Sequence, residues 1–218
     1  MSNLPFLSKL LVKVVLHQLR SHLLANNLSE TFQSAYRAHH ITETALLDVT
    51  KCLLGNADEG RVSILTSLNL PAAFDTLDRS ILLARLQDRF GISGEAFEWF
   101  SPYLSDRFQS VSVNSRVSSQ KKLHYGVPQG SVLGLILFTL YTQPLPDIIS
   151  QSKCNHKKIT DDSQLHQSST PSDFHTLNHN NEQCDHSVGR WITCNRLKLN
   201  NDKTEALVVG SHSKVRVS

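Results

Sequence analysis

The chain lacks the features by which several protein classes are identified from sequence. Only four of its 218 residues are cysteine, and no two have Cys-x-x-Cys spacing, so neither a redox motif nor a common zinc ribbon is indicated. No apolar run reaches the roughly 18 residues that a membrane helix needs, and the first residues lack the basic and then apolar layout of a signal peptide. We therefore expect an intracellular protein without a transmembrane segment.

Excess positive charge is also small. The net charge is +3 with histidine neutral. Dedicated nucleic-acid binders usually cluster their basic residues, whereas here they are scattered, and residues 116–122 are the nearest approach to a basic patch. With 39% hydrophobic and 19% charged residues, the composition is that of a globular protein long enough to bury a core.

Histidine and cysteine gather in one stretch near the C-terminal end. The candidate ligands there are His175, His179, Cys184, His186 and Cys194. His175 and His179 could share one helical face and bind zinc. The segment is polar, however, and such residue types without a paired knuckle match by accident, so a zinc module ranks behind the other hypotheses.

The hydrophobic pattern predicts a mixture of helices and strands. Helices are predicted over 8–25, 41–55, 79–90, 94–104 and 131–142, and strands over 61–70, 107–113 and 121–125. Ser8 and Asp78 are the expected N-caps, Gly91 and Pro144 the expected stops, and a tight loop is expected from Gly126. Elements in this order suggest an α+β or α/β arrangement.

Several motifs occur in one order along nearly the whole chain. They are NLPFLSK at 3–9, QSAYR at 33–37, HITETAL at 40–46, LNLPAAFDT at 68–76, GVPQGSVLG at 126–134, DDSQL at 161–165, NRLKLN at 195–200 and KTE at 203–205. Together they resemble the reverse transcriptase domain of non-LTR (LINE-type, jockey-like) retrotransposons. One motif alone would be weak, and each remains a hypothesis until its structural context confirms it.

The resemblance implies an α+β fold, the right-hand polymerase with fingers and palm but no thumb. It assigns residues 1–57 to the fingers, 58–210 to the palm with a fingers insertion at about 80–125, and 211–218 to a tail. It implies a fragment of an RNA-directed DNA polymerase whose partners are an RNA template, a DNA primer and deoxynucleoside triphosphates, with no membrane.

The resemblance also implies a metal site. Nucleotide addition uses two divalent ions, and Mg²⁺ prefers carboxylate oxygens. Asp161 matches the main ligand and Asp162 its less direct neighbour, while Asn69 stands where the family has its first metal-binding aspartate. Asparagine offers a carbonyl oxygen without charge. Lys203 matches a lysine that could protonate the leaving pyrophosphate.

Four further residues match nucleotide-binding positions of the family. Phe74 matches the aromatic that excludes a 2′ hydroxyl, Arg37 a fingers residue near the triphosphate, and Gln129 and Gly130 the loop that approaches the template and the incoming nucleotide. Phe74 could equally be a core aromatic at a strand end. The other positions are also compatible with a surface arginine and a plain strand-to-helix turn.

Departures from the family pattern accompany Asn69. Ile159 and Thr160 replace Tyr-Ala, Pro71 replaces a small residue, and Leu135 stands where proline is common. The strand before Asp161 contains lysines 157 and 158, which would be costly in a buried sheet unless they reach solvent. We therefore expect a catalytically impaired polymerase. The alternative is a non-catalytic relic that at most binds nucleic acid or a protein partner.

The resemblance makes two geometric predictions. Asn69, Asp161 and Asp162 should meet at the ends of adjacent strands, within reach of a common ion. Arg37, Lys121, Lys122 and Lys203 should border one cleft, because a template groove needs positive potential for phosphates.

Overall fold

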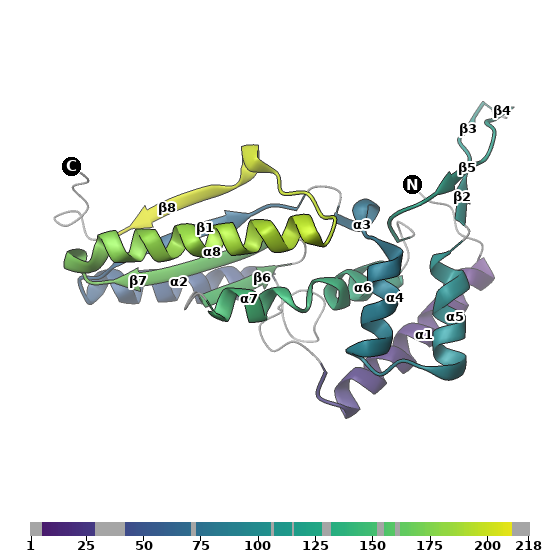
Figure 1. Cartoon of the computed structure of the whole chain (residues 1–218), viewed down its shortest axis with the longest axis horizontal. Coiled ribbons are helices and arrows are strands. Elements are labelled where there is room, and N and C mark those ends of the chain that lie inside the picture. Colours follow the sequence, from purple (N-terminus) through teal and green to yellow (C-terminus); the bar gives the residue numbers. More distant parts are fainter. Residues whose placement is uncertain are drawn as a thin grey trace. The chain divides into compact units, whose positions relative to one another are not determined.

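The computed structural model describes residues 6–28, 42–70, 73–105, 107–114, 116–127, 132–151, 155–159 and 162–210 (Figure 1). The chain divides into two compact units. The first comprises Met1–Ser29 and Ala72–Thr142, and the second Glu30–Pro71 and Gln143–Ser218. Each unit is described by itself.

The first unit is a helical cluster that carries a β-ribbon. Its elements are α1 (Phe6–Ala25), α3 (Ala73–Thr76), α4 (Arg79–Asp88), α5 (Gly94–Leu104), β2 (Arg107–Gln109), β3 (Ser112–Val113), β4 (Arg116–Val117), β5 (Lys121–Leu123) and α6 (Val132–Thr142). Helix α6 contacts α1, α3 and α4. Because α6 is apolar on nearly all sides, it forms the core, with Leu133, Leu137 and Tyr141 fully buried.

Both predicted ends of α4 are confirmed. The Asp78 carboxylate accepts hydrogen bonds from the backbone N–H groups of Ser80 (3.0 Å) and Ile81 (3.1 Å), which have no partner within the helix. Gly91 adopts a left-handed φ of 64°, and its N–H donates to the Gln87 carbonyl (3.2 Å). The cap predicted for α1 is wrong, because the helix begins at Phe6 and Ser8 lies within it.

The second unit is built on an antiparallel sheet with strand order β6-β7-β1-β8 among the described residues. Its elements are α2 (Thr42–Asp58), β1 (Val62–Leu68), α7 (Leu145–Gln151), β6 (Asn155–Ile159), β7 (Asp162–Ser169), the 3-10 turn η1 (Pro171–Asp173), α8 (Phe174–Cys194), the 3-10 turn η2 (Asn201–Lys203) and β8 (Glu205–Val209). The predicted α+β class is confirmed at the level of mixed helices and an antiparallel sheet.

Helices cover both faces of this sheet at β1. Ser63 is hydrogen-bonded by Asn56 of α2 (3.2 Å), and Thr66 donates to Asn181 of α8 (3.3 Å). Ser63 and Thr66 are three positions apart, so they point to opposite faces of the strand. The helices α2 and α8 therefore lie on opposite sides, as Figure 1 shows for this unit.

The position of β6 changes the interpretation of its two lysines. Burial of these two lysines in the interior of a sheet would be costly, but their strand, β6, is an edge strand of the described sheet. Charged residues are ordinary on edge strands, where they discourage pairing with other chains. The lysines are therefore no argument against a folded sheet.

One helical stretch, Val132–Gln151, is long and apolar enough by composition to cross a membrane, with a mean hydropathy of 1.5. Half of it is buried inside the protein. Core helices pass the same test, so this stretch is weak evidence for a membrane span.

A chain of polar side chains links α8 to the middle of β1. Asn181, which accepts the hydrogen bond from Thr66, donates to Oδ2 of Asp185 (3.1 Å). Oδ1 of Asp185 is buried and has no hydrogen-bond partner among the described residues. Burial, with a smaller effect of neighbouring Glu182, raises the pKa of Asp185 to about 6 from its usual 3.8. The folded state therefore favours the protonated carboxyl group.

This pKa shift predicts that Asp185→Asn stabilises the protein above pH 6 and leaves it unchanged at low pH. A raised carboxyl pKa gives stability that is complete below 3.8 and is lost as the pH rises through about 6. Because the group is partly exposed, we expect a gain of about 1 kcal/mol in the free energy of unfolding near neutral pH. Urea denaturation from about pH 4 to about pH 8 measures it. The control Glu182→Gln should show a smaller gain, and a pH-independent difference for Asp185→Asn would contradict the assignment.

Candidate active site

The ends of β1 and β7 bring together part of the predicted metal site. The two strands pair antiparallel with Leu68 opposite Ser163. Asn69 follows Leu68, and Asp162 precedes Ser163, so both residues lie at the same end of neighbouring strands. Asp162 also pairs with Ile159 of β6. Residues 160 and 161, and with them Asp161, lie outside the described residues.

The NRLKLN motif is joined to this end of the sheet through the main chain. The N–H of Asn200 donates to the carbonyl of Asn69 (2.9 Å), and the Asn200 carbonyl accepts from the Thr204 hydroxyl (2.8 Å) and the Lys203 N–H (3.1 Å). Glu205, which follows Thr204, is the first residue of β8 and pairs with Ser67 of β1. Lys203 therefore lies near the Asn69 end of the sheet, with an exposed side chain.

The donor atoms at this end fit a divalent cation only in part. Asn69 is half-buried and would offer a neutral amide oxygen, whereas Mg²⁺ prefers carboxylates. Among the described residues, no three His, Cys, Asp or Glu side chains gather as a metal site would require. The negative charge needed to bind a divalent cation would have to come from the carboxylates of Asp161 and Asp162, whose side-chain positions the structure does not describe. The common ion remains a prediction.

The hypothetical zinc ligands all lie on helix α8. Cys184 is buried and Cys194 is exposed at the end of the helix. His179 contacts the side chain of Gln183, and His186 contacts Arg190. This part of the structure lends the zinc module no support.

In the first unit, Gly126 lies in very close contact with α3. Its φ is 80°, its N–H donates to the Leu77 carbonyl (2.8 Å), and the N–H of Val127 donates to the Phe74 carbonyl (2.9 Å). A Cβ atom at position 126 would lie 2.8 Å from the carbonyl oxygens of Phe74 and Asp75. Glycine is therefore required both by the backbone conformation and by the available space.

Arg79 holds the same loop from the other side. Its guanidinium is buried and donates to three carbonyls, those of Leu123 (2.6 Å), Tyr125 (2.9 Å) and Gly126 (2.9 Å). Burial, and then the charge of Arg107, lower the pKa of Arg79. Sequence reasoning missed this residue. A clue was its place at the start of a helix, where the helix dipole disfavours a cation.

The predicted nucleotide-binding residues are only partly described. Phe74 lies in α3, is half-buried, and has its ring centroid 5.2 Å from that of Phe138 in α6. This contact fits the core-aromatic interpretation and leaves the nucleotide role untested. Arg37, Gln129 and Gly130 lie outside the described residues.

The predicted cleft of four basic residues also stays a prediction. Lys121 and Lys122 are exposed on β5 of the first unit, and Lys203 belongs to the second. The fourth member, Arg37, lies outside the described part of the chain.

Comparison with known proteins gives a family match over nearly the whole sequence. The family described as reverse transcriptase (RNA-dependent DNA polymerase) matches residues 1–216. The probable RNA-directed DNA polymerase from transposon X-element of Drosophila melanogaster is 28% identical over 163 residues, covering 74% of this chain and 18% of the relative. The RNA-directed DNA polymerase from mobile element jockey of Drosophila funebris is 28% identical over 146 residues, covering 67% of this chain and 16% of the relative. The chain thus spans less than a fifth of the length of these relatives.

Solved telomerase structures share the fold. An apo telomerase from Candida tropicalis aligns with a TM-score of 0.63 and 13% identity, over 93% of this chain and 41% of that one. A telomerase from Candida albicans, in complex with a TWJ fragment of telomeric RNA, aligns with a TM-score of 0.62 and 16% identity, over 92% and 36%. At these identities the likeness concerns the fold alone.

The contacts of Gly126 predict that Gly126→Ala is much more destabilising than Gly91→Ala. Both glycines have a left-handed φ, but a Cβ at Gly91 would meet nothing within 4 Å. Gly91→Ala should therefore cost about 1 kcal/mol of backbone strain, and Gly126→Ala at least about 1–3 kcal/mol more, because the loop must leave α3. Urea denaturation of the two variants measures the difference. Equal losses would show that the contact with α3 does not constrain this position.

Proposed function

The chain belongs to the reverse transcriptase (RNA-dependent DNA polymerase) family, and on this premise we propose that it is the fingers-and-palm part of a non-LTR retrotransposon polymerase with an impaired metal site. The proposal keeps residues 1–57 as fingers, 58–210 as palm with an insertion at about 80–125, and 211–218 as a tail. Its partners would be an RNA template, a DNA primer and deoxynucleoside triphosphates. The observation that carries it is the pairing of β1 with β7, which has Asn69 and Asp162 at one end of the sheet.

The proposed site joins one neutral oxygen to two carboxylates. Magnesium ions, when bound, would reduce the cost of negative charge on the attacking and leaving oxygens of the transferred phosphate. Asp161 and Asp162 would provide the charge, and Asn69 only an amide dipole. The Asn200 N–H bound to the Asn69 carbonyl would keep the end of β1 in place. Loss of one carboxylate weakens the site without removing its framework.

The remaining roles follow the family positions. Lys203, exposed near the Asn69 end of the sheet, would donate a proton to the leaving pyrophosphate. Phe74 would lie under the sugar, and Arg37 would bind the triphosphate. Gln129 and Gly130 would approach the template. The backbone hydrogen bonds of Gly126 and Val127, which precede Gln129 with Pro128 between them, support this last role.

The second candidate function is a non-catalytic relic that at most binds nucleic acid or a protein partner. Asn69 is the observation that favours it, because an uncharged ligand binds Mg²⁺ more weakly than a carboxylate does. The two candidates differ in one measurable respect. An impaired enzyme is repaired by restoring the carboxylate, whereas a relic that has lost more of its site is not.

We predict negligible primer extension by the unmodified chain and a measurable gain for Asn69→Asp. Removal of one key charge-stabilising group typically costs on the order of 10²–10³ in rate, so restoring the carboxylate should recover part of that factor. The assay is deoxynucleotide incorporation on a primed RNA template with Mg²⁺ and with Mn²⁺. Asn26→Asp, which adds the same charge at an exposed position of the first unit, should give no gain.

Four outcomes of this assay test the site assignment and decide between the candidates. Asp161→Asn in the Asn69→Asp background should abolish the gain, because both residues would serve the same ion. If the repaired activity survives Asp161→Asn, the site assignment is wrong. Robust synthesis by the unmodified chain would contradict the proposed impairment, and no activity in any variant would favour the relic.

A further inference from the structure

Residues 107–114 and 116–125 form a two-stranded ribbon, and apart from the cleft predicted for Lys121 and Lys122 it has no role in the function proposed above. Arg107 to Gln109 of β2 pair with Leu123 to Lys121 of β5, and Ser112 and Val113 of β3 pair with Val117 and Arg116 of β4. Between these pairs, the Ser118 N–H donates to the Val111 carbonyl (2.9 Å), and the Val111 N–H donates to the Ser118 hydroxyl (3.0 Å). Figure 1 shows the ribbon leading away from α5, with β3 and β4 at its far end.

The base of the ribbon is firmly held. Arg79 binds the carbonyl of Leu123, the last residue of β5, and that of Tyr125, two residues further on. On the other strand, Arg107 donates a hydrogen bond to the carbonyl of Tyr103 in α5 (3.3 Å). Its guanidinium also lies 5.6 Å from the centre of the Tyr103 aromatic ring. A ribbon fixed at its base keeps its direction, which lowers the entropy lost when it binds a partner.

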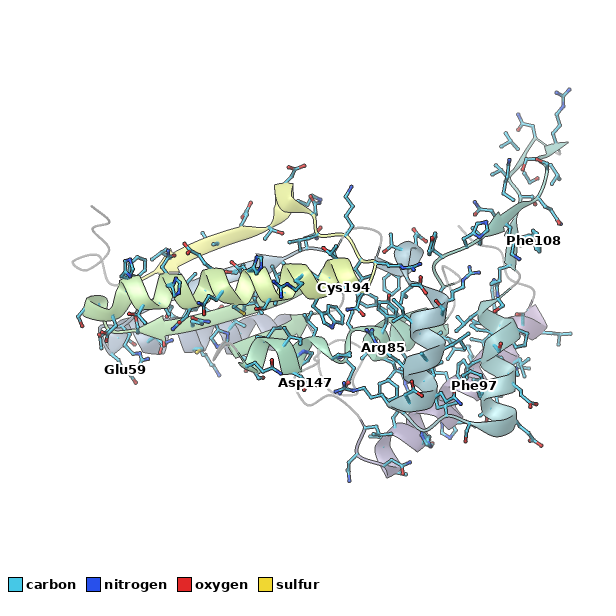
Figure 2. The ribbon with its side chains drawn as sticks, in the orientation of Figure 1. Glu59, Arg85, Phe97, Phe108, Asp147 and Cys194 are labelled. Atoms are coloured by element: carbon cyan, nitrogen blue, oxygen red, sulfur yellow. The ribbon has the colours of Figure 1, made fainter. Side chains whose placement is uncertain are left out.

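The outer part of the ribbon leaves apolar side chains in water. Val111, Val113 and Val117 are 60–66% exposed, and Phe108, labelled in Figure 2, is 54% exposed. Branched and aromatic residues are usual in strands, but here no core covers them. By the strand register, Val113 shares a face with Arg116 and Val117 shares the opposite face with Ser112, so both faces of the tip present an apolar side chain to solvent.

The charged residues of the ribbon are all basic. Between positions 107 and 125 the sequence has four Arg and Lys residues and no Asp or Glu. Lys121 shares a face with Gln109, and Lys122 shares the opposite face with Phe108, because cross-strand partners point the same way and successive residues alternate. Arg116 lies in the last pair before the turn. Positive charge is therefore present on both faces and at the tip.

We propose that this ribbon binds double-stranded DNA by entering its major groove. The inference rests on the proposed function only in that the protein acts on nucleic acid. A B-form major groove admits a two-stranded β-ribbon, and phosphates line both of its walls, where Lys121 and Lys122 would contact them. The tip valines would then contact thymine methyl groups, which lie in the same groove.

The dimensions agree with entry into a groove. The segment from Arg107 to Val113, which contains β2 and β3, has seven residues and would span roughly 20 Å if fully extended at about 3.3 Å per residue. The major groove of B-form DNA is about 8.5 Å deep, so the tip can reach the base edges while the anchored base stays outside. The major groove of an RNA duplex is too narrow for side chains to read. A DNA duplex is therefore the occupant that fits.

The test measures binding of the full chain to a labelled DNA duplex of roughly 30 base pairs, about three helical turns. The ribbon variant combines Arg116→Gln, Lys121→Gln and Lys122→Gln. Its matched control combines Lys9→Gln, Lys13→Gln and Lys51→Gln, which remove equal charge from exposed positions of α1 and α2. We expect the ribbon variant to bind at least about tenfold more weakly. The slope of log K against log salt should also fall by about two to three, since each lost phosphate contact removes about 0.9.

A second variant tests the groove contact without changing charge. Val113→Ser with Val117→Ser should weaken binding to an A·T-rich duplex by a few-fold and leave the salt slope unchanged. An RNA duplex of equal length should bind more weakly and be insensitive to this pair. Circular dichroism should show every variant folded, as expected for exposed positions.

Three results would overturn the inference. They are equal losses in the ribbon variant and its control, equal binding of DNA and RNA duplexes, and no effect of the valine changes. The proposed polymerase function is tested separately, by primer extension with the Asn69→Asp chain. Lack of extension with ribbon-dependent DNA binding would reject that function alone. Extension without ribbon-dependent binding would reject only the groove inference.

Discussion

The register between β1 and β7 is the constraint on which the proposed site depends. Side chains alternate along a strand, so a slip of one residue would turn every side chain of β1 to the other face. Val62, Ile64 and Leu68 are buried on the face that also holds Thr66, and a slip would replace them with Ser63, Leu65 and Ser67. Burial of this alternating set holds Leu68 opposite Ser163 and thereby Asn69 beside Asp162.

Polar contacts make the same register specific. Thr66 binds Asn181 on one face of β1, and Ser63 binds Asn56 on the other. Each bond adds only about 1 kcal/mol to stability, but leaving either partner buried and unpaired costs about 1–3 kcal/mol. Any other register between the strands would separate these partners, leave them buried and unpaired, and so destabilise the sheet by that amount. The raised pKa of Asp185, at the end of this polar chain, follows first from burial of its carboxyl group and then from the charge of Glu182.

A second, independent constraint acts in the first unit, where the Arg79 guanidinium and Gly126 fix one short loop. Burial of a guanidinium is costly unless its donors are satisfied, and three carbonyls satisfy them here. The same loop follows β5 at the base of the ribbon and precedes the PQG segment at 128–130.

The family, most element types and the local turn chemistry could be predicted from the sequence by itself. Asp78 and Gly91 act through neighbours within four or five positions, so their residue types are enough to place the ends of α4. The ordered motifs and the substitution at Asn69 are likewise visible without coordinates. The 21-residue helix α8 was not predicted, because the polar Asn181 is among its buried positions and interrupts the apolar stripe.

Contacts between distant residues were decided only by the tertiary structure. Nothing local in the sequence indicates that Arg79 reaches carbonyls more than 40 positions away, that β8 pairs with β1, or that the lysine-bearing β6 lies at a sheet edge. Hydrophobic periodicity reports which face of an element is buried but not which element covers it. The chemical character of the site was therefore set by residue type, whereas its assembly at one end of β1 and β7 was set by strand pairing between segments nearly a hundred positions apart.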